Sequence, residues 1–489
     1  MERAEPRTIL RTTLLLAAAL AVAGCSSLMP RSVEQPAADP QIPPAWGAGP
    51  ASTAAPSASG MLPDYVDYRT FLRDPRLVAA VEAALTSNRD LRQAVLNVER
   101  ARAAHAITAA DRVPTVGASG QATRSGGDGA PPPNRFNQLG VGITAFELDL
   151  FGRVKALDDA ALARYLATSE ARRAAQVALV AEVANAWLNL AGQRSLRAVA
   201  ADTVEINQRA LDLAQSRHQA GAISGLDLAQ AEAQVQTART DLSRYDGQIA
   251  QAANLLQLLV GRPLEAGWLP DRLEDVELGV APVPAGMSSS VLLRRPDVMA
   301  AEHMLQAAGA NIAAARAAYF PRIALTGSVG VASQSLGELF DSGTGFWSFV
   351  PSISLPLFDG GRRDAALNVA DVDRRIALAA YEQAIQAGFR EVSDALALQS
   401  ATSTQLASQE QLLAIAQRVE RLSDARYRAG ADSSLQLIDA QRNLYGARLG
   451  LVAARLVELL NRVASHRALG GGSLAVDPPD PAPAVRPAA

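Results

Sequence analysis

The chain has 489 residues, a formal net charge of −3, 49% hydrophobic residues and a single cysteine. Weak acidity excludes a protein that binds nucleic acid through a basic face. One cysteine excludes an intrachain disulfide and a zinc–cysteine cluster.

Residues 1–24 have the pattern of a secretory signal. Three arginines precede an apolar run from Leu14 to Ala23, and small residues then lead to Cys25. A run of about ten apolar residues is too short to remain as a membrane-spanning helix, which needs roughly 20. The sequence therefore predicts an exported protein whose signal peptide is removed.

The only cysteine of the chain stands at the expected cleavage point. This placement resembles the bacterial lipobox, which implies that Cys25 is the lipidation site and becomes the acylated N-terminus. In that motif Ser26, at the next position, implies export to the outer membrane. Several acyl chains hold a protein stably on a bilayer. Residues 30–63 are rich in Pro, Ala, Gly and Ser, which predicts an extended segment. Residues 25–63 as a whole are therefore predicted to form a lipidated, extended N-terminal tether.

A segment of about 120 residues occurs twice, roughly 208 residues apart. Phe151–Arg153 corresponds to Phe358–Arg362, and Arg217–Gly221 corresponds to Arg426–Gly430. Such an internal duplication predicts a pseudo-symmetric structural body. An enzyme more often shows one asymmetric cluster of reactive side chains.

Each repeat begins with short helices and continues into a β-hairpin. Residues 64–114 and 263–320 are predicted to hold the short helices, the second after a linker. Prolines then end the helical pattern. Residues 115–150 and 321–357 are predicted to form one β-hairpin each, with strands of about ten residues joined by loops near 126–138 and 334–345. Alternating apolar and small residues of this length are typical of transmembrane β-barrel strands.

Each repeat ends with a long helical hairpin, at residues 151–262 and 358–470. The first helix of each runs for 68 residues, 153–220 and 362–429, without proline. Such a helix extends about 100 Å, so it must pack lengthwise against partners as a coiled coil. Residues 471–489 are predicted to be a disordered tail.

Four strands cannot close a membrane barrel, because about eight are the minimum. Open sheet edges are not tolerated in lipid, since their backbone groups are unpaired. Three copies would supply twelve strands and twelve long helices. The predicted fold is therefore mostly α with transmembrane β: a trimeric 12-stranded barrel, four strands per chain, continuous with an α-helical barrel of antiparallel hairpins.

Several motifs, in order, resemble one family. They are Glu147–Arg153 and Pro356–Arg362 at the strand-to-helix junctions, Leu293–Val298 and Ala314–Ile323 in the middle, and Arg426–Gly430 with Leu437–Arg442 in the second hairpin. The chain resembles the outer membrane factors of tripartite efflux systems, the TolC-like proteins, and in particular the NodT lipoprotein branch. The resemblance covers about residues 64–472.

The resemblance implies a homotrimeric channel in the outer membrane with a large periplasmic portion. Its implied partners are a periplasmic adaptor (membrane fusion protein), an inner-membrane pump of the resistance–nodulation–division type, and outer-membrane lipid. It implies passive conduction of small molecules, with no cofactor and no catalysis.

The resemblance also places a periplasmic gate at the hairpin tips. Asp439 matches the aspartate of a constriction ring, and Leu435 matches an apolar ring one helical turn earlier. Residues four apart share a helix face, which agrees with this assignment. Gln436 replaces a second ring acid of some members.

A hairpin latch is implied by two further positions. Tyr427 matches a tyrosine that ties the two hairpins together, and its partner in relatives is an acid at the position of Asp227. Asp432 stands where some relatives carry a basic latch residue.

Two other classes of protein are alternatives. An enzyme is disfavoured because the four histidines are scattered, with no metal-ligand spacing, and because no nucleophile elbow or phosphate loop occurs. The second alternative is a lipid-tethered periplasmic coiled-coil protein without channel activity.

Overall fold

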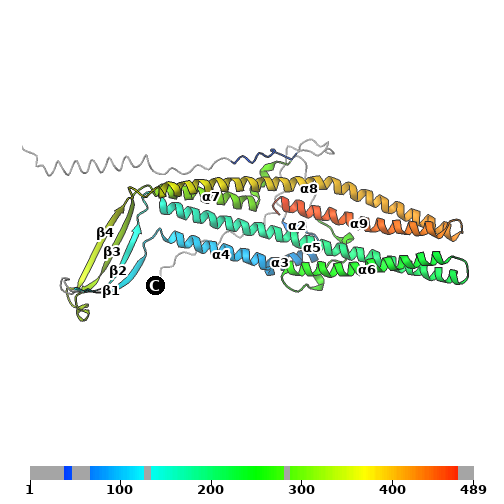
Figure 1. Ribbon diagram of the computed structural model, residues 1–489, viewed down its shortest axis with the longest axis horizontal. Coiled ribbons are helices and arrows are strands. Elements are labelled where there is room, and N and C mark those ends of the chain that lie inside the picture. Colours follow the sequence, from blue (N-terminus) through cyan, green and yellow to red (C-terminus); the bar gives the residue numbers. More distant parts are fainter. Residues whose placement is uncertain (1–37, 47–66, 126–133, 280–286, 472–489) are drawn as a thin grey trace, which may run out of the picture. The chain divides into compact units, whose positions relative to one another are not determined.

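The computed structural model describes residues 38–46, 67–125, 134–279 and 287–471 (Figure 1). The predicted signal peptide, Cys25, most of the predicted tether and nearly all of the predicted tail lie outside the described residues. The chain divides into two compact units. The sheet unit contains residues 97–169 and 300–382, and the hairpin unit contains residues 40–96, 170–299 and 383–471.

Four antiparallel strands form the sheet of the sheet unit, in the order β1-β2-β3-β4. Their bounds are β1 Val116–Ser125, β2 Asn134–Glu147, β3 Arg322–Ser333 and β4 Gly345–Ser354. The four strands per chain predicted from the sequence are confirmed. β2 begins earlier than the predicted loop 126–138 allowed, because its polar first residues pair with the end of β1.

The two faces of the sheet differ in chemistry. Residues Ala118, Val141, Val329 and Trp347 lie in one row across all four strands. The last three are 48%, 63% and 79% exposed. On the same face lie Val116, Leu139, Ile143, Leu325, Val331, Phe349 and Ile353. The opposite face carries mostly small and polar residues, with Phe136, Phe346 and Val350 as the large apolar exceptions. This alternation is typical of a sheet with one face toward lipid.

A β-bulge in β2 keeps the apolar side chains on that face. The register shifts between Ile143 and Phe146, and Ala145 takes a left-handed φ of 52°. In a regular strand Phe146, three residues after Ile143, would point to the opposite face, because side chains alternate along a strand. The extra residue of the bulge returns Phe146 to the face of Ile143.

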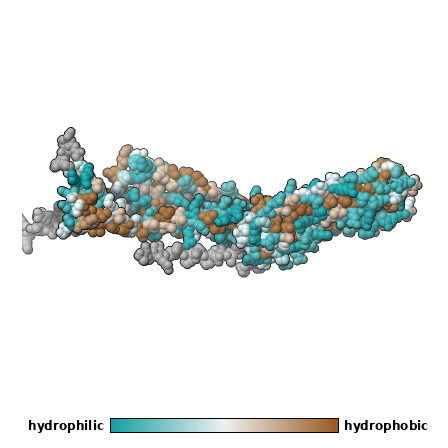
Figure 2. All heavy atoms as spheres, turned by 90° about the horizontal axis from the view of Figure 1, so that it is seen from below, coloured by the Kyte–Doolittle hydropathy of each residue, from teal (hydrophilic) through white to brown (hydrophobic). Residues whose placement is uncertain are grey.

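Two long helical hairpins follow the strands, as predicted. The first consists of α5 (Arg153–Gln219) and α6 (Gly225–Val260), and the second of α8 (Arg362–Arg428) and α9 (Ser434–Ala468). Figure 2 shows apolar residues intermixed with polar ones over the helices on one face of the molecule. On this face, the helices do not present the single apolar stripe of an isolated surface helix.

Short helices connect these elements. They are α2 (Tyr68–Phe71), α3 (Pro75–Ser87), α4 (Arg89–Ala110) and α7 (Pro296–Ala317), with 3₁₀ turns at Ala266–Trp268, Leu273–Asp275, Ser289–Arg294 and Leu336–Glu338. The two short helices expected near residues 90–110 and 296–318 correspond to α4 and α7.

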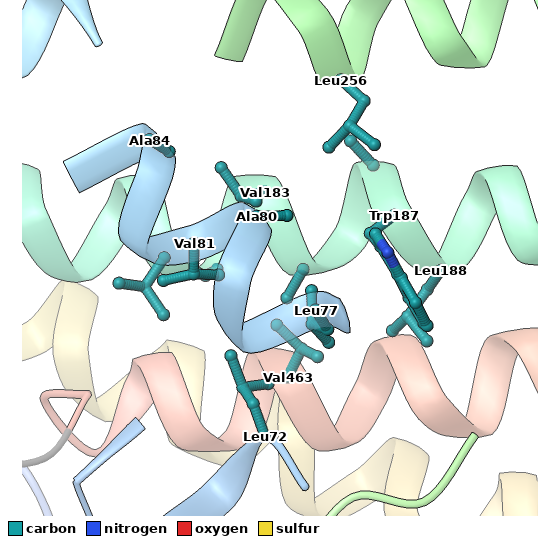
Figure 3. Packing of buried hydrophobic residues seen from close by; sticks show 14 of the residues in the cluster. Leu72, Leu77, Ala80, Val81, Ala84, Val183, Trp187, Leu188, Leu256 and Val463 are labelled. Atoms are coloured by element: carbon teal, nitrogen blue, oxygen red, sulfur yellow. The ribbon is translucent and has the colours of Figure 1, made fainter. Parts of the chain in front are cut away.

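The core of the hairpin unit is built around α3. Leu77 and Val81 of this helix are fully buried, together with Trp187 of α5 and Leu256 of α6 (Figure 3). The indole of Trp187 donates a hydrogen bond to the backbone oxygen of Trp268 at 2.7 Å. Because buried side chains here come from both repeats, including Val463 of α9, the core fixes the first hairpin to the second.

The duplication extends to individual contacts. The amide of Asn88 donates to the backbone oxygen of Leu259 at 2.8 Å. At the corresponding place in the second repeat, the Arg295 guanidinium donates to the backbone oxygen of Ala468 at 2.7 Å. Each bond satisfies a carbonyl near the end of the return helix. Arg295 also pairs with two carboxylates, of Asp297 and Glu391, so its buried charge is compensated.

Part of the predicted tether is docked on the protein. Trp46 is 3% exposed, stacks on Phe389 of α8, and donates hydrogen bonds from its indole to Phe389 and Ser393. A short bridge also joins Ala45 to Ser288. The extended-tether interpretation of residues 25–63 therefore does not apply to residues 40–46, because a buried tryptophan fixes them.

The close approach of β2 and β3 gives a test of the sheet. A Cβ at Gly330 would collide with the backbone oxygen of Leu139, whereas a Cβ at Gly117, on the same face, meets nothing within 4 Å. We expect Gly330→Ala to cost about 1–3 kcal/mol and to lower the yield of folded protein, measured by heat-modifiable migration on gels. Gly117→Ala is the control. Equal yields of folded barrel for the two variants would contradict the register described here.

Candidate gate at the hairpin tips

The two hairpin tips have the same backbone structure. In the first, the amides of Gly221 and Ala222 donate to the backbone oxygens of His218 and Arg217. The second tip repeats both bonds, from Gly430 to Tyr427 and from Ala431 to Arg426. The glycines have left-handed φ values of 70° and 72°. This double bond pattern around a left-handed glycine ends a helix while satisfying its last carbonyls.

Each return helix then begins with a capping box. Ser224 and Asp227 exchange hydrogen bonds between side chain and backbone at the start of α6, and Ser433 and Gln436 do the same at the start of α9. The box satisfies amides that have no partner within the helix. Gln436, expected as a replacement for a ring acid, thus has a local structural role.

Polar contacts join the first hairpin to the second. The Ser434 hydroxyl donates to the Asp227 carboxylate at 2.6 Å. The Arg217 guanidinium donates to the Tyr427 hydroxyl at 2.9 Å and lies 5.3 Å from the centre of its ring.

The two predicted latch residues, Tyr427 and Asp227, therefore each make a contact between the hairpins, but they do not bond to each other. The pairing of Tyr427 with Asp227 is replaced by two separate contacts, because the first carboxylate oxygen of Asp227 accepts from Ser434 and the second accepts from Ser224. Arg217 supplies the tyrosine with a donor instead.

A third contact lies further along the same helices. The Tyr445 hydroxyl of α9 donates to the Asp241 carboxylate of α6 at 2.8 Å. Burial, followed by the bond to Asp241, raises the pKa of Tyr445 well above its ordinary value. The phenol therefore stays protonated and keeps donating at any physiological pH.

Electrostatics at the tips favour ionised carboxylates. Hydrogen bonds from Ser434, and then from Ser224, lower the pKa of Asp227. A bidentate pair with Arg426, at 2.6 and 2.9 Å, lowers the pKa of Asp432. Asp432 thus stabilises the turn of its own hairpin through this ion pair. This role follows from its position six residues after Arg426, across the glycine turn.

The predicted gate residues lie on the exposed side of α9. Leu435 is 52% exposed and Asp439, one turn later, is also exposed, whereas the adjacent Ala440 is 4% exposed. In the described part of the chain, no hydrogen bond or ion pair engages the Asp439 carboxylate. An apolar side chain and a carboxylate therefore face away from the protein's own packing, on the same helix face.

Three contact residues were not predicted from the sequence. Arg217 lies in the repeated motif that was recognised, but the repeat gives no reason to pair it with Tyr427. Ser434 and Tyr445 carry no signal of their own. Within the described residues, no group of three or more His, Cys, Asp or Glu side chains is placed to hold a metal ion.

Comparisons with known proteins agree with this architecture. The family described as "Outer membrane efflux protein" matches the chain twice, over residues 80–262 and 287–471. These two matches correspond to the two repeats.

Three similar proteins illustrate the relationship. The antibiotic efflux pump outer membrane protein ArpC of Pseudomonas putida is 38% identical over 476 residues, covering 94% of this chain and 96% of the relative. The cation efflux system protein CusC of Escherichia coli K12 is 38% identical over 413 residues, covering 83% and 88%. The open state of the MtrE outer membrane channel of Neisseria gonorrhoeae is 34% identical with a TM-score of 0.82, covering 90% and 97%.

The matching family is described as an outer membrane efflux protein, and ArpC is named as the outer membrane protein of an antibiotic efflux pump. The resemblance stated from the motifs is confirmed over most of the chain. The chain therefore belongs to the outer membrane efflux protein family, and it is an outer-membrane channel of an efflux pump rather than an enzyme.

Proposed function

We propose that three copies of this chain form one passive channel, with a 12-stranded barrel in the outer membrane and a helical tunnel in the periplasm. The observation that carries the proposal is the sheet. Among the described strands, β1 and β4 each pair on one side only. An apolar face exposed to lipid together with two open edges is not tolerated within a bilayer. Further copies must complete the barrel.

The partners proposed are a periplasmic adaptor protein and an inner-membrane pump of the resistance–nodulation–division type. The described chain supplies a conduit and no energy source, so transport must be driven elsewhere. ArpC is named for antibiotics and CusC for cations. We therefore assign small molecules or ions as the transported class, with selection made before the channel.

Cys25 is proposed as the lipid attachment site, which would hold each copy on the outer membrane. Trp46 supports this arrangement, because its buried contacts on α8 fix the chain to the body 21 residues after the cysteine. At about 3.3–3.6 Å per residue, the intervening segment spans at most roughly 75 Å. The lipid is thus confined near its own protomer.

Leu435 and Asp439 are proposed to close the periplasmic end of the tunnel. Threefold assembly would turn the one exposed leucine into an apolar ring and the one exposed aspartate into a ring of three carboxylates. Like charges at short range repel each other and attract cations. The closed state therefore needs other contacts to hold it, and we propose the contacts of Tyr427 and Asp227 for this role.

The central test is the number of chains and the conductance of the full-length lipoprotein purified in detergent. We expect a heat-sensitive trimer on gels and discrete channel openings in planar bilayers, because only a closed barrel satisfies the sheet edges. A monomer that folds but never conducts would support the tether alternative and reject the channel assembly.

The gate assignment predicts that Leu435→Ala combined with Asp439→Ala raises the conductance of the channel. The change removes both rings at the tip and leaves the packed face of α9 untouched. Leu412→Ala is the control, since Leu412 lies on α8 and is 49% exposed, a similar fraction. Unchanged conductance in the double variant, with trimers intact, would place the constriction elsewhere.

The latch assignment predicts that Tyr427→Phe with Ser434→Ala favours the open state. Each lost hydrogen bond should shift the open-to-closed ratio by about two- to tenfold, from roughly 0.5–1.5 kcal/mol. Ser216→Ala is the control, because that hydroxyl binds only a carbonyl of its own helix, of Asp212. Single-channel open probability measures the effect, and a double variant that opens no more often than Ser216→Ala counts against a latch.

The same contact predicts a pH dependence. The pKa of Asp227 is lowered. The ionised carboxylate therefore contributes its full stabilisation of the closed state above the ordinary carboxyl pKa of about 3.9, and this stabilisation is lost as the pH falls through the lowered pKa. The difference in open probability between Ser434→Ala and the unaltered channel should therefore persist from neutral pH to about pH 5. A difference that disappears at pH 6 would contradict the assignment.

A further inference from the structure

Charged residues are rare in the sheet, and they fall into two groups. The charged residues of the four described strands are Arg124, Arg135, Glu147 and Arg322. The Arg322 guanidinium pairs with the Glu147 carboxylate at 2.6 Å, and Glu147 also pairs with Arg153 at 2.7 Å. In the part of the chain that the structure describes, no carboxylate pairs with Arg124 or Arg135. The positive charge of these two side chains is therefore not compensated there.

The two uncompensated arginines lie directly opposite each other on the apolar face of the sheet. Arg124 of β1 is the register partner of Arg135 of β2, and both are exposed. Side chains alternate along a strand, so Arg124, eight residues after Val116, shares the face of Val116, Val141 and Trp347. Like charges directly opposite each other destabilise a strand pair. An anion from outside the chain would remove this repulsion.

The arginine pair lies at the outer end of the strands. β2 ends at Glu147 and leads into α5 at Arg153, so Arg135, near its start, is at the end far from the helices. Because the helical part of this outer-membrane channel is periplasmic, that end faces the cell exterior. Eight residues separate Arg135 from Ile143 on the apolar face, which is about 26 Å along the strand and roughly 20 Å across the membrane at the usual strand tilt. The apolar band of such barrels is about 25 Å tall, so the arginines lie near its outer boundary.

A buried amide holds one of the two arginines in place. Asn137, two residues after Arg135 and on the same face, is 1% exposed. Its nitrogen donates to the backbone oxygen of Ser333 at 3.3 Å, and its oxygen accepts from the Arg124 guanidinium at 3.4 Å. A guanidinium has five N–H donors, and this bond uses one of them. Arg124 is therefore positioned by the sheet and keeps donors for a ligand.

We propose that Arg124 and Arg135 bind a phosphate group of the glycolipid that forms the outer leaflet of the membrane. A guanidinium donates paired hydrogen bonds to a phosphate and stays charged at any physiological pH. Two such groups side by side match the double charge of one phosphate, while Leu139 and Val141, nearer the membrane centre, contact acyl chains of the same molecule. The proposal rests on the barrel proposed above, which turns this face toward lipid.

Two other anions fit the pair less well. A transported anion inside the channel would meet the opposite face of the sheet, which carries Gln121 and Thr123, and not the arginines. A free phosphate ion would use the two guanidinium groups but not the apolar residues beside them. The glycolipid uses both, because its phosphate and its acyl chains follow the same order as the charged and apolar residues along β2.

Binding of diphosphorylated lipid A to the full-length lipoprotein in detergent tests the site. Native mass spectrometry counts the lipid A molecules on each trimer, and we expect up to three, one for each copy. Combining Arg124→Gln with Arg135→Gln should weaken binding about tenfold or more, because hydrogen bonds to charged groups are the stronger ones. The double variant should fold at least as well as the unaltered chain, since it removes a like-charge pair.

The combination of Arg209→Gln with Arg375→Gln is the matched control. Both arginines lie on long helices, and their side chains are 70% and 73% exposed. The control therefore loses the same charge away from the sheet, and it should bind lipid A as tightly as the unaltered chain. The trimer band on gels and the conductance in planar bilayers should be unchanged in both double variants, because neither alters the channel lining of the sheet.

Several results would overturn the site. One is equal affinity for lipid A in the variant without Arg124 and Arg135, and another is equal binding of lipid A from which both phosphates have been removed. Displacement of lipid A by an equal concentration of inorganic phosphate would reject the lipid as occupant in favour of a free anion. Intact, conducting trimers that bind no lipid A would overturn this proposal alone, whereas a failure to form trimers would reject the assembly and the site with it.

Discussion

Unpaired backbone groups at the edges of a sheet are the constraint on which the rest of this structure depends. In water such groups bind solvent, but in lipid each costs several kilocalories per mole. Among the described residues, the sheet from β1 to β4 has two such edges, and this is the reason for the assembly of several copies that we propose. The tandem repeat is consistent with this requirement, because it already builds one strand–strand junction, β2 with β3, that a second copy can imitate.

The duplication also explains why similar sequences have different surroundings. Arg295 and Asn88 make corresponding bonds to the ends of the return helices, so the repeats share their internal construction. They differ where one repeat meets the other. Three alanines on α5 are buried, whereas larger Val and Ile side chains at the corresponding positions of α8 are exposed (Ala160, Ala163 and Ala167 against Val369, Val372 and Ile376).

The hairpin tips combine stable turns with weak connections. Each turn is fixed by a left-handed glycine and a capping box. The connections between the hairpins are a few part-buried polar contacts, through Ser434 and Tyr427, each worth about 1 kcal/mol. The gate that we propose at the tips would need this contrast, because rigid turns keep the tip residues in place while weak contacts let the hairpins separate.

The sequence alone determined the class of the protein. Proline-free runs predicted the long helices, alternation predicted the strands, and the repeat predicted their pairing into two similar halves, because these patterns are local. The spacing of four also predicted that Leu435 and Asp439 share one helix face. The tertiary structure decided which side chains meet: Arg217 with Tyr427, Ser434 with Asp227, and Trp46 with α8. Those contacts join residues distant in sequence, and only the packing of the folded helices brings them within hydrogen-bonding distance.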